Sequence, residues 1–205
     1  MIKSKEELFE YIKQDRLMNE FPPMRSFSEV IKNAFFPNAV TFLLYMRKLE
    51  YYTNVRTFFG GIFRIYYTYK YRVASRQLGY SIGLNVCGPG LSLPHYGTII
   101  ISGEARLGKN CRVHAFVNIG TSGGGKKAPT IGNNVYIGPS CVLFGDIEIA
   151  NNVTIGANAT VNHSCETEHV ILAGTPAKVV KTGYPNWLEF NKMKKGNHEN
   201  SCCSI

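Results

Sequence analysis

An aliphatic residue recurs at every sixth position through much of the second half of the chain. With one interruption, these anchor positions are Ile101, Leu107, Val113, Ile119, Ile131, Ile137, Leu143, Ile149, Ile155 and Val161. Apolar or small residues recur four positions after an anchor, at Cys111, Val117, Val135, Cys141, Ile147, Val153, Ala159 and Cys165. An α-helix cannot keep a six-residue period on one face, and an ordinary strand alternates with a period of two. The pattern therefore predicts a solenoid of short strands joined by tight corners.

Glycine and asparagine stand between the anchors, where a corner can require a positive φ. They are Gly108, Asn110, Asn133, Asn134, Asn151, Asn152 and Asn158. The resulting motif, [Ile/Leu/Val]-Gly-x-x-[small]-x, is the hexapeptide repeat of left-handed parallel β-helices. We therefore predict a mainly β fold, with such a coil over residues 79–183. The inward small position explains Cys111, Cys141 and Cys165 as core residues, and the spacing of the six cysteines suggests no disulfide framework.

The repeat is interrupted once, between Ile119 and Ile131, where the expected anchor position holds Gly125. We expect residues 120–130 to leave the coil as an extended loop. An interruption in an otherwise regular coil favours a functional element, and a tolerated insertion is the alternative.

Residues 1–78 are expected to form an α-helical cap on one end of the coil, where it would cover open strand edges. Ser4-x-x-Glu7 and Ser26-x-x-Glu29 have the form of capping boxes. Pro22-Pro23, Pro37 and Gly60-Gly61 should divide the helices. Residues 184–205 are expected to form a C-terminal tail.

The stretch 47–76 combines seven basic residues and one acidic residue with many aromatic ones. We favour ordinary helix packing with solvated arginines. The alternative is an interfacial helix that contacts an anionic membrane surface from the cytoplasmic side.

The composition and the N-terminal sequence indicate where in the cell the protein is expected. Hydrophobic residues make up 44% of the chain, and its longest strongly apolar run, 39–45, is far shorter than the roughly 18 residues of a membrane span. The N-terminus lacks the apolar core of a signal peptide, so we expect a cytoplasmic protein. The net charge of +9 could attract an anionic ligand or an anionic surface, but the sequence contains no nucleic-acid-binding motif.

Two histidines lie where chemistry is plausible. His95 lies in Gly-Leu-Ser-Leu-Pro-His-Tyr-Gly-Thr, just before the regular frame begins, and His114 follows the anchor Val113. Imidazole can take a proton from an alcohol near neutral pH, although a structural role for His95 is also consistent with the local pattern. His114 is read as a substrate contact or a spectator. No clustered ligand set suggests a metal.

Residues 79–181 resemble the serine acetyltransferase branch of the hexapeptide-repeat acetyltransferases. The resemblance rests on the stretches GPGLSLPHYGTIIISGEARLGKNC, VNIGTSGGG, IGNNVYIGPSCVLFGDIEI and VTIGANATVN…ILAGTPAKVV. The shorter N-terminal part is more similar to relatives found in capsule and lipopolysaccharide gene clusters, many of which act on sugars.

The resemblance implies an acetyl-CoA-dependent enzyme, a homotrimer or a dimer of trimers, with His95 as the catalytic base and sites between neighbouring coils. It further implies a CoA channel lined by Gly120, Thr121, Gly138, Ala157, Ala173, Gly174, Pro176, Ala177 and Lys178. Lys178 and Lys181 could meet the CoA phosphates.

The acceptor side departs from serine acetyltransferases. Ser81 stands where the family has the aspartate that orients the histidine, Pro94 replaces an acidic residue, and Lys127-Ala128 replaces an Arg-His pair that holds the serine carboxylate. Glu104 is the nearest candidate to orient His95 instead.

Three hypotheses follow. The first is O-acetylation of a sugar of a surface polysaccharide or its precursor, with Ser81, His114 and Lys127 on the acceptor side. The second is serine O-acetylation for cysteine synthesis, which the terminal Ile205 favours because similar tails dock cysteine synthase. The third is a non-catalytic trimeric scaffold that does not bind CoA.

Overall fold

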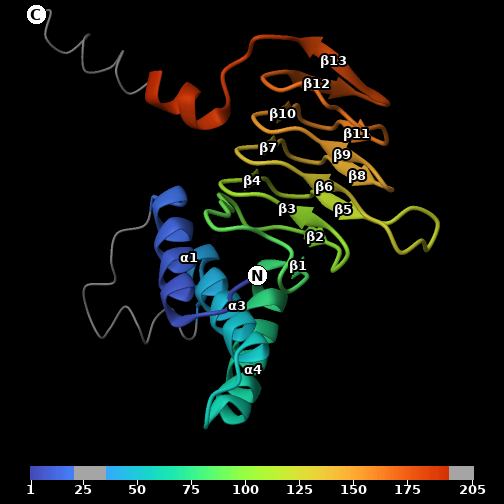
Figure 1. Cartoon of the computed structure of the whole chain (residues 1–205). Coiled ribbons are helices and arrows are strands. Elements are labelled where there is room, and N and C mark those ends of the chain that lie inside the picture. The colour runs from blue at the N-terminus through green and yellow to red at the C-terminus, as the bar shows by residue number, and fades with distance from the viewer. Residues whose placement is uncertain (21–35, 194–205) are drawn as a thin grey trace, which may run out of the picture.

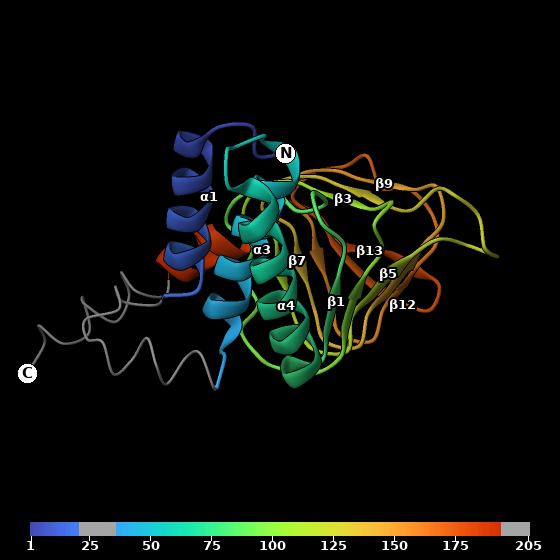
Figure 2. The ribbon, with the colours of Figure 1, turned by 90° about the horizontal axis from the view of Figure 1, so that it is seen from below.

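The computed structural model describes residues 1–20 and 36–193. Among these residues, the chain begins with the helices α1 (Lys5–Met18), α3 (Ala39–Asn54) and α4 (Gly60–Leu78). They gather on one side of a β coil, and the segment after β5 projects from the opposite side (Figures 1 and 2). No helix among the described residues is long and apolar enough to cross a membrane.

The coil has three faces, each a sheet of short, parallel-stacked strands. Face A consists of β1 (Tyr80–Ile82), β2 (Ile99–Ile101), β5 (Asn118–Gly120), β8 (Val142–Phe144) and β11 (Thr160–Val161). Face B consists of β3 (Arg106–Leu107), β6 (Thr130–Ile131) and β9 (Glu148–Ile149). Face C consists of β4 (Arg112–Val113), β7 (Tyr136–Ile137), β10 (Thr154–Ile155), β12 (Ile171–Gly174) and the antiparallel β13 (Ala177–Lys181). The predicted left-handed β-helix with an N-terminal helical region is confirmed.

The anchors form the core of the coil. All ten are at most 5% exposed, and the second set, from Cys111 to Cys165, is buried as well. Inward side chains of successive turns stack directly, as in the register Val113–Ile137–Ile155. The four described cysteines are free thiols inside this core, as the frame predicted for Cys111, Cys141 and Cys165.

Asparagines hold the corner between faces B and C. Asn110, Asn134 and Asn152 adopt positive φ there, and each of the first two donates an amide hydrogen bond to the next, at 3.1 and 3.0 Å. Beside them, Asn133 donates to Asn151 at 3.0 Å. Both ladders end on Glu168, whose carboxylate accepts from Asn151 and Asn152 and whose pKa is lowered by these two bonds.

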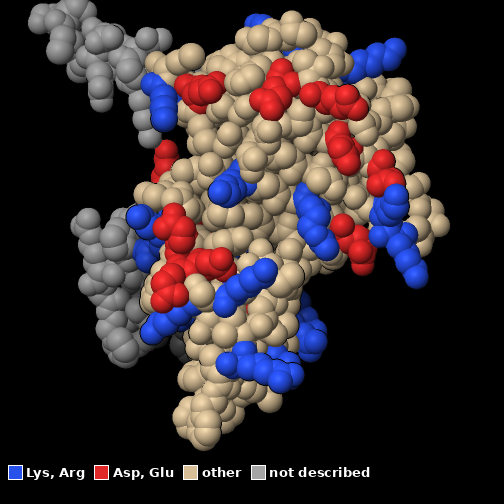
Figure 3. Space-filling view, viewed as in Figure 1, with Lys and Arg blue, Asp and Glu red and all other residues tan. Residues whose placement is uncertain are grey.

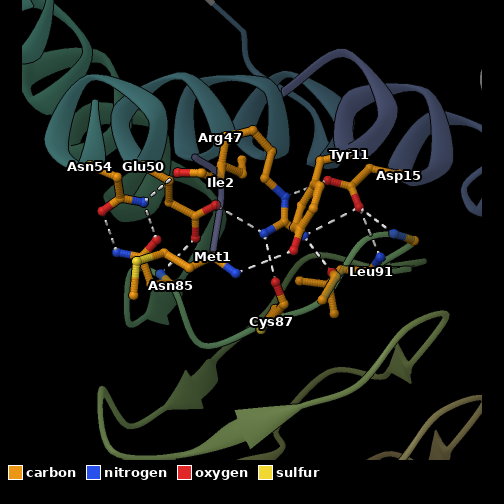
Figure 4. A network of polar contacts seen from close by, with 12 residues as sticks. Met1, Ile2, Tyr11, Asp15, Arg47, Glu50, Asn54, Asn85, Cys87 and Leu91 are labelled. Carbon is orange, nitrogen blue, oxygen red and sulfur yellow. Dashed lines mark hydrogen bonds and ion pairs between the residues drawn. The ribbon is translucent and has the colours of Figure 1, made fainter. Parts of the chain in front are cut away.

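A buried ion cluster fastens the helices to the first turn of the coil (Figure 4). Arg47, fully buried on α3, pairs with Asp15 of α1 at 2.8 Å and with Glu50 at 3.1 Å. Its guanidinium also donates to the carbonyls of Cys87 and Gly88. Burial by itself would lower the pKa of Arg47, but the two carboxylates raise it above its ordinary value. The helices therefore supply hydrogen-bond partners to the open end of the coil.

Several sequence expectations can be checked at the helix ends. Ser4 caps α1 by accepting from the Glu7 backbone N–H, as predicted, and Asn38 caps α3 directly after Pro37. Gly60 and Gly61 form the first turn of α4. The Ser26–Glu29 capping box, Pro22-Pro23 and the terminal Ile205 lie outside the described residues.

The aromatic stretch packs only in part. Tyr71 of α4 packs against the core, with its ring centroid 5.3 Å from that of Phe42 of α3. However, Phe58 is 94% exposed and Ile65 is 72% exposed. Ordinary helix packing, the favoured expectation, therefore accounts for only one side of α4.

Candidate active site at one corner of the coil

His95 lies at the corner where face C of the first turn passes into β2 on face A. The Tyr80 hydroxyl donates to the His95 carbonyl at 2.9 Å, and Gly97 adopts a φ of 132° to complete the corner. The imidazole itself is exposed, and its centroid lies 5.7 Å from that of His114 on the next turn. The structure thus brings together two histidines that lie 19 positions apart in the sequence.

His114 is a neutral imidazole at neutral pH. Burial, followed by the charges of Arg112 and His95, lowers its pKa to about 4. Its Nε2 is buried without a hydrogen-bond partner among the described residues, and its ring lies 4.9 Å from that of Tyr136. An uncharged neighbour adds no repulsion when His95 takes up a proton.

Small residues continue the column of His114 along the coil. The register places Gly138, Gly156 and Ala173 on the three turns that follow. A Cβ at Gly138 would lie 2.8 Å from the Ala157 nitrogen, so stacking of the turns alone requires glycine there. At Gly156 the same atom would make ordinary contacts at 3.4 Å. Beyond His114, this column therefore carries only small residues.

A hollow of about 510 Å³ lies beside His95. Its walls come from the end of α1, the start of α3 and the coil, and the lining includes Met18, Asn19, Glu20, Asn38, Pro94, His95 and Arg112. This volume can accommodate a small polar acceptor.

A second hollow, of about 370 Å³, lies beyond Arg112 and is lined largely by aromatic rings. The segment after β13 folds back over face C to close it, with Tyr184, Trp187 and Phe190 facing His114 and Tyr136. The Trp187 indole donates to the Asn110 carbonyl at 3.0 Å, and the Arg112 guanidinium lies 5.3 Å from the Trp187 ring. Most of the segment 184–190 thus packs on the coil.

The segment between β5 and β6 projects from the coil (Figure 1), and it is shorter than the predicted loop 120–130 because Gly120 and Thr130 belong to strands. Gly120 still pairs with Phe144 on face A, and Thr121 begins the departure. Lys127 forms an exposed ion pair with Asp146 at 2.5 Å, which raises the Lys127 pKa. Ala128 is 7% exposed and packs in the coil core.

Within one chain, the structure corrects the assignment of Glu104 as the residue that orients His95. Glu104 lies at the corner between faces A and B, where its backbone N–H donates to Ser102, whereas His95 lies at the corner between faces C and A. Glu104 therefore does not orient His95 of the same chain, and sequence proximity was misleading because each turn passes three corners. Ser81 lies on the outer side of face A, paired with Ile100, and its side chain forms no hydrogen bond with His95 of the same chain.

The residues predicted to line a CoA channel are spread along the coil. Ala173, Gly174, Ala177 and Lys178 meet in the β12–β13 hairpin, which has a cis peptide before Pro176. Four strand spacings, or about 19 Å, separate the His95 turn from this hairpin. The successive register partners on face C are Ser92, Arg112, Tyr136, Thr154 and Ile171. Ala157 is exposed at an intermediate turn, and Lys181 lies over the Tyr184 ring at 5.3 Å.

Sequence reasoning missed Arg112, Tyr136 and Asn19. The first two precede anchors, so the repeat frame places both on the outer side of face C, one turn apart. The repeat frame alone could therefore have predicted that these two side chains lie side by side. Asn19 and Trp187 had no periodic signal, because they come from segments outside the repeat.

Residues 128–163 match the profile of the bacterial transferase hexapeptide family, six repeats. The matched residues lie in the middle and later turns of the coil, from the residues before β6 to β11. Serine acetyltransferase of Synechococcus elongatus is 32% identical over 95 residues, which cover 45% of this chain and 38% of the relative. Serine acetyltransferase of Mycobacterium tuberculosis is 32% identical over 103 residues, covering 49% and 44%. The chain thus matches less than half the length of these curated relatives.

Solved structures of serine acetyltransferases agree in fold with this chain. Serine acetyltransferase of Neisseria gonorrhoeae superposes with a TM-score of 0.63 at 23% identity, over 87% of this chain and 68% of that one. The soybean apoenzyme gives 0.64 at 19% identity, over 86% and 70%. At these identities the likeness concerns the fold alone.

Proposed function

We propose that the protein is an acetyl-CoA-dependent O-acetyltransferase with His95 as general base. The observation that carries the proposal is the exposed His95 imidazole at a coil corner, bordered by neutral His114 and a hollow of about 510 Å³. His95 would accept the proton of an acceptor hydroxyl as its oxygen attacks the thioester carbonyl, and would return that proton to the departing thiolate. General-base catalysis of this kind contributes roughly 10²–10⁴-fold in rate.

The remaining roles follow from placement. The small residues Gly156 and Ala173 leave room for the slim pantetheine chain of acetyl-CoA. Lys178 and Lys181 lie at the far end of the coil, where they could pair with the CoA phosphates. Backbone N–H groups of the glycine-rich loop after Gly120 would stabilise the oxyanion.

The proposal includes assembly into a homotrimer, alone or as a dimer of trimers. The outer side of face A exposes Ile100 and Val142, at 39% and 37%, in one column of the sheet. Packing of this column against a neighbouring coil would bury it. The loop 120–130 of one copy could then reach the His95 corner of the next.

L-serine is the acceptor that the relatives favour, since both curated relatives described above carry that activity in their names. Under this proposal the chain serves cysteine synthesis, and Ile205 would dock cysteine synthase. A pull-down with and without Ile205 would test the docking.

A sugar hydroxyl is the second candidate, and the acceptor side of this chain favours it. Lys127 is paired with Asp146 on the surface, and Ala128 is an apolar residue in the core that offers no donor to a serine carboxylate. The aromatic lining of Tyr136, Tyr184 and Trp187 suits the apolar face of a sugar ring.

The deciding experiment follows CoA release from acetyl-CoA with a thiol reagent, for wild type and His95→Ala, against L-serine and a panel of sugars. Release with serine alone supports the serine acetyltransferase proposal, and release with a sugar alone supports the second candidate. No release with any acceptor, together with no binding of acetyl-CoA, would contradict both and leave the scaffold hypothesis.

A further inference from the structure

One end of α4 carries large apolar side chains that the described part of the chain leaves uncovered. We call this surface the α4 tip; it comprises Phe58, Phe59, Ile62, Phe63, Ile65, Tyr66 and Tyr69. These side chains are between 42% and 94% exposed. Single exposed apolar residues are ordinary, but a contiguous patch marks an interaction surface. Figure 1 shows the tip at the opposite end of the molecule from β13.

Spacing along the helix makes the patch a second apolar face of α4. Ile62, Ile65, Tyr66 and Tyr69 follow the i, i+3, i+4, i+7 rule and so share one side. The fold uses another side, on which Ala74 and Leu78 join the core shared with α3 and the coil. The exposed face is therefore not needed to hold α4 in place.

The charges around the tip have one sign. From residue 51 to residue 103 the sequence contains no aspartate or glutamate, but it contains Arg56, Arg64, Lys70, Arg72 and Arg76. Arg72 and Arg76 follow Tyr69 by three and seven positions and so continue the same side of the helix. At 1.5 Å per residue, Arg72 lies about 10 Å from Ile65 along the axis. On the side shown in Figure 3, Lys and Arg side chains surround the lower end of the molecule and no acidic ones lie there.

We propose that the α4 tip docks on the surface of a lipid bilayer rich in anionic headgroups. Apolar side chains of an interfacial helix enter about 5–10 Å into the boundary between headgroups and acyl chains. The helix enters with its N-terminal end first. With Ile62 and Ile65 at that depth, Arg72 and Lys70 lie at the level of the lipid phosphates, where each basic residue adds about 1 kcal/mol to the binding free energy. Phenylalanine and tyrosine rings suit this partly apolar, partly wet layer.

Charge argues against a second copy of the chain as the occupant. A symmetric contact would place the same patch on both partners, so the cations of one tip would face those of the other. An anionic surface neutralises them instead. The proposal is independent of the proposed function, because it concerns an end of the molecule away from His95 and its test involves no acetyl transfer.

The test is flotation of the full chain with lipid vesicles at low and at physiological salt. One set of vesicles is phosphatidylcholine, and the other contains phosphatidylserine as well. The wild type is expected to bind the anionic vesicles and to lose binding as salt rises. Ile62→Ser with Ile65→Ser should lower the partition coefficient more than tenfold, and Arg72→Gln with Arg76→Gln roughly 30-fold.

Phe9→Ser is the matched control, because Phe9 is 61% exposed on α1, away from the tip, and its loss should leave binding unchanged. Circular dichroism and gel filtration establish that each variant folds as the wild type does. Absence of wild-type binding, or unchanged binding of the Ile62→Ser, Ile65→Ser variant, would overturn the proposal. A change of oligomeric state in that variant, without vesicle binding by the wild type, would assign the tip to self-association instead.

Discussion

The Asn19 side chain accepts a hydrogen bond from the Leu93 backbone N–H at 2.9 Å, two residues before His95. The same amide donates to the Leu91 carbonyl at 2.8 Å. One turn earlier on α1, Asp15 accepts from the N–H groups of Gly90 and Leu91. A helix from the start of the chain thus fixes the segment that carries the proposed base.

Asn19→Ala should therefore reduce kcat as well as stability. We expect a loss of about 1–2 kcal/mol in the free energy of unfolding and a fall of roughly tenfold in kcat, because the His95 segment loses two anchors. Asn19→Asp keeps the acceptor for Leu93 and should recover part of the rate. Steady-state kinetics and urea unfolding measure the two effects; a stability loss with unchanged kcat would limit Asn19 to a structural role.

His95→Ala should lower kcat by roughly 10²–10⁴-fold, the usual contribution of a general base, with little effect on folding because the side chain is exposed. His163→Ala is the matched control, since that exposed histidine lies toward the end of the coil. If His95→Ala kept its turnover, another group would have to be the general base.

His114 predicts a dependence of stability on pH. Its pKa falls from 6.5 to about 4 on folding, so between these pH values the unfolded chain binds a proton that the folded chain does not. The free energy of unfolding should therefore decrease as pH falls from 6.5 to 4. Because the side chain is partly exposed, we expect about 1–2 kcal/mol. Denaturant unfolding at several pH values should show a flatter profile for His114→Gln; identical profiles would contradict the prediction.

Arg47→Met should be among the most destabilising single changes. It leaves the carboxylates of Asp15 and Glu50 buried without their cation, at a cost of about 3–5 kcal/mol. Arg72→Gln, an exposed change on the next helix, should stay within about 0.5 kcal/mol of the wild type. Thermal and chemical unfolding would compare the two, and equal effects would argue against the ion cluster as the fastening of the helices.

Gly138→Ala tests the stacking of the coil. The new methyl group would meet the Ala157 nitrogen at 2.8 Å, so we expect a loss of about 1–3 kcal/mol. Gly103→Ala has no atom within 4 Å of the added Cβ and should be nearly neutral. A neutral Gly138→Ala would mean that the turns can separate locally.

The coil was predictable because its rule is local and repeated. Each anchor from Ile101 to Val161 makes the same kind of inward contact. The ten anchors are all spaced by multiples of six residues, so together they predict the coil even though each one alone would not. The coil's first turn escaped that frame: Tyr80, Ile82 and Leu93 are buried, but their spacing departs from six. Among the corner residues, Asn110 and Asn158 have the expected positive φ, whereas Asn133 and Asn151 use their side chains as hydrogen-bond partners instead.

The site was predictable only where it lies inside the repeat. His95 and His114 meet because the register stacks neighbouring turns, and Arg112 was readable for the same reason. Asn19 and Trp187 reach the site from outside the coil, so no periodicity relates them to it. Glu104 is close to His95 in the sequence, but the coil places the two residues at different corners, so closeness in sequence did not predict a contact.

The asparagine ladders have a polarity, and Glu168 gives them an end. Each amide passes a hydrogen bond toward the C-terminus, so any rung can be followed by another rung. A carboxylate can only accept, and at Glu168 two rows converge on one group that has nothing to pass on. A solenoid built from interchangeable repeats has no intrinsic length. Here both ladders end on the last turn of the coil, at an acidic side chain that offers no donor for a further asparagine to accept from.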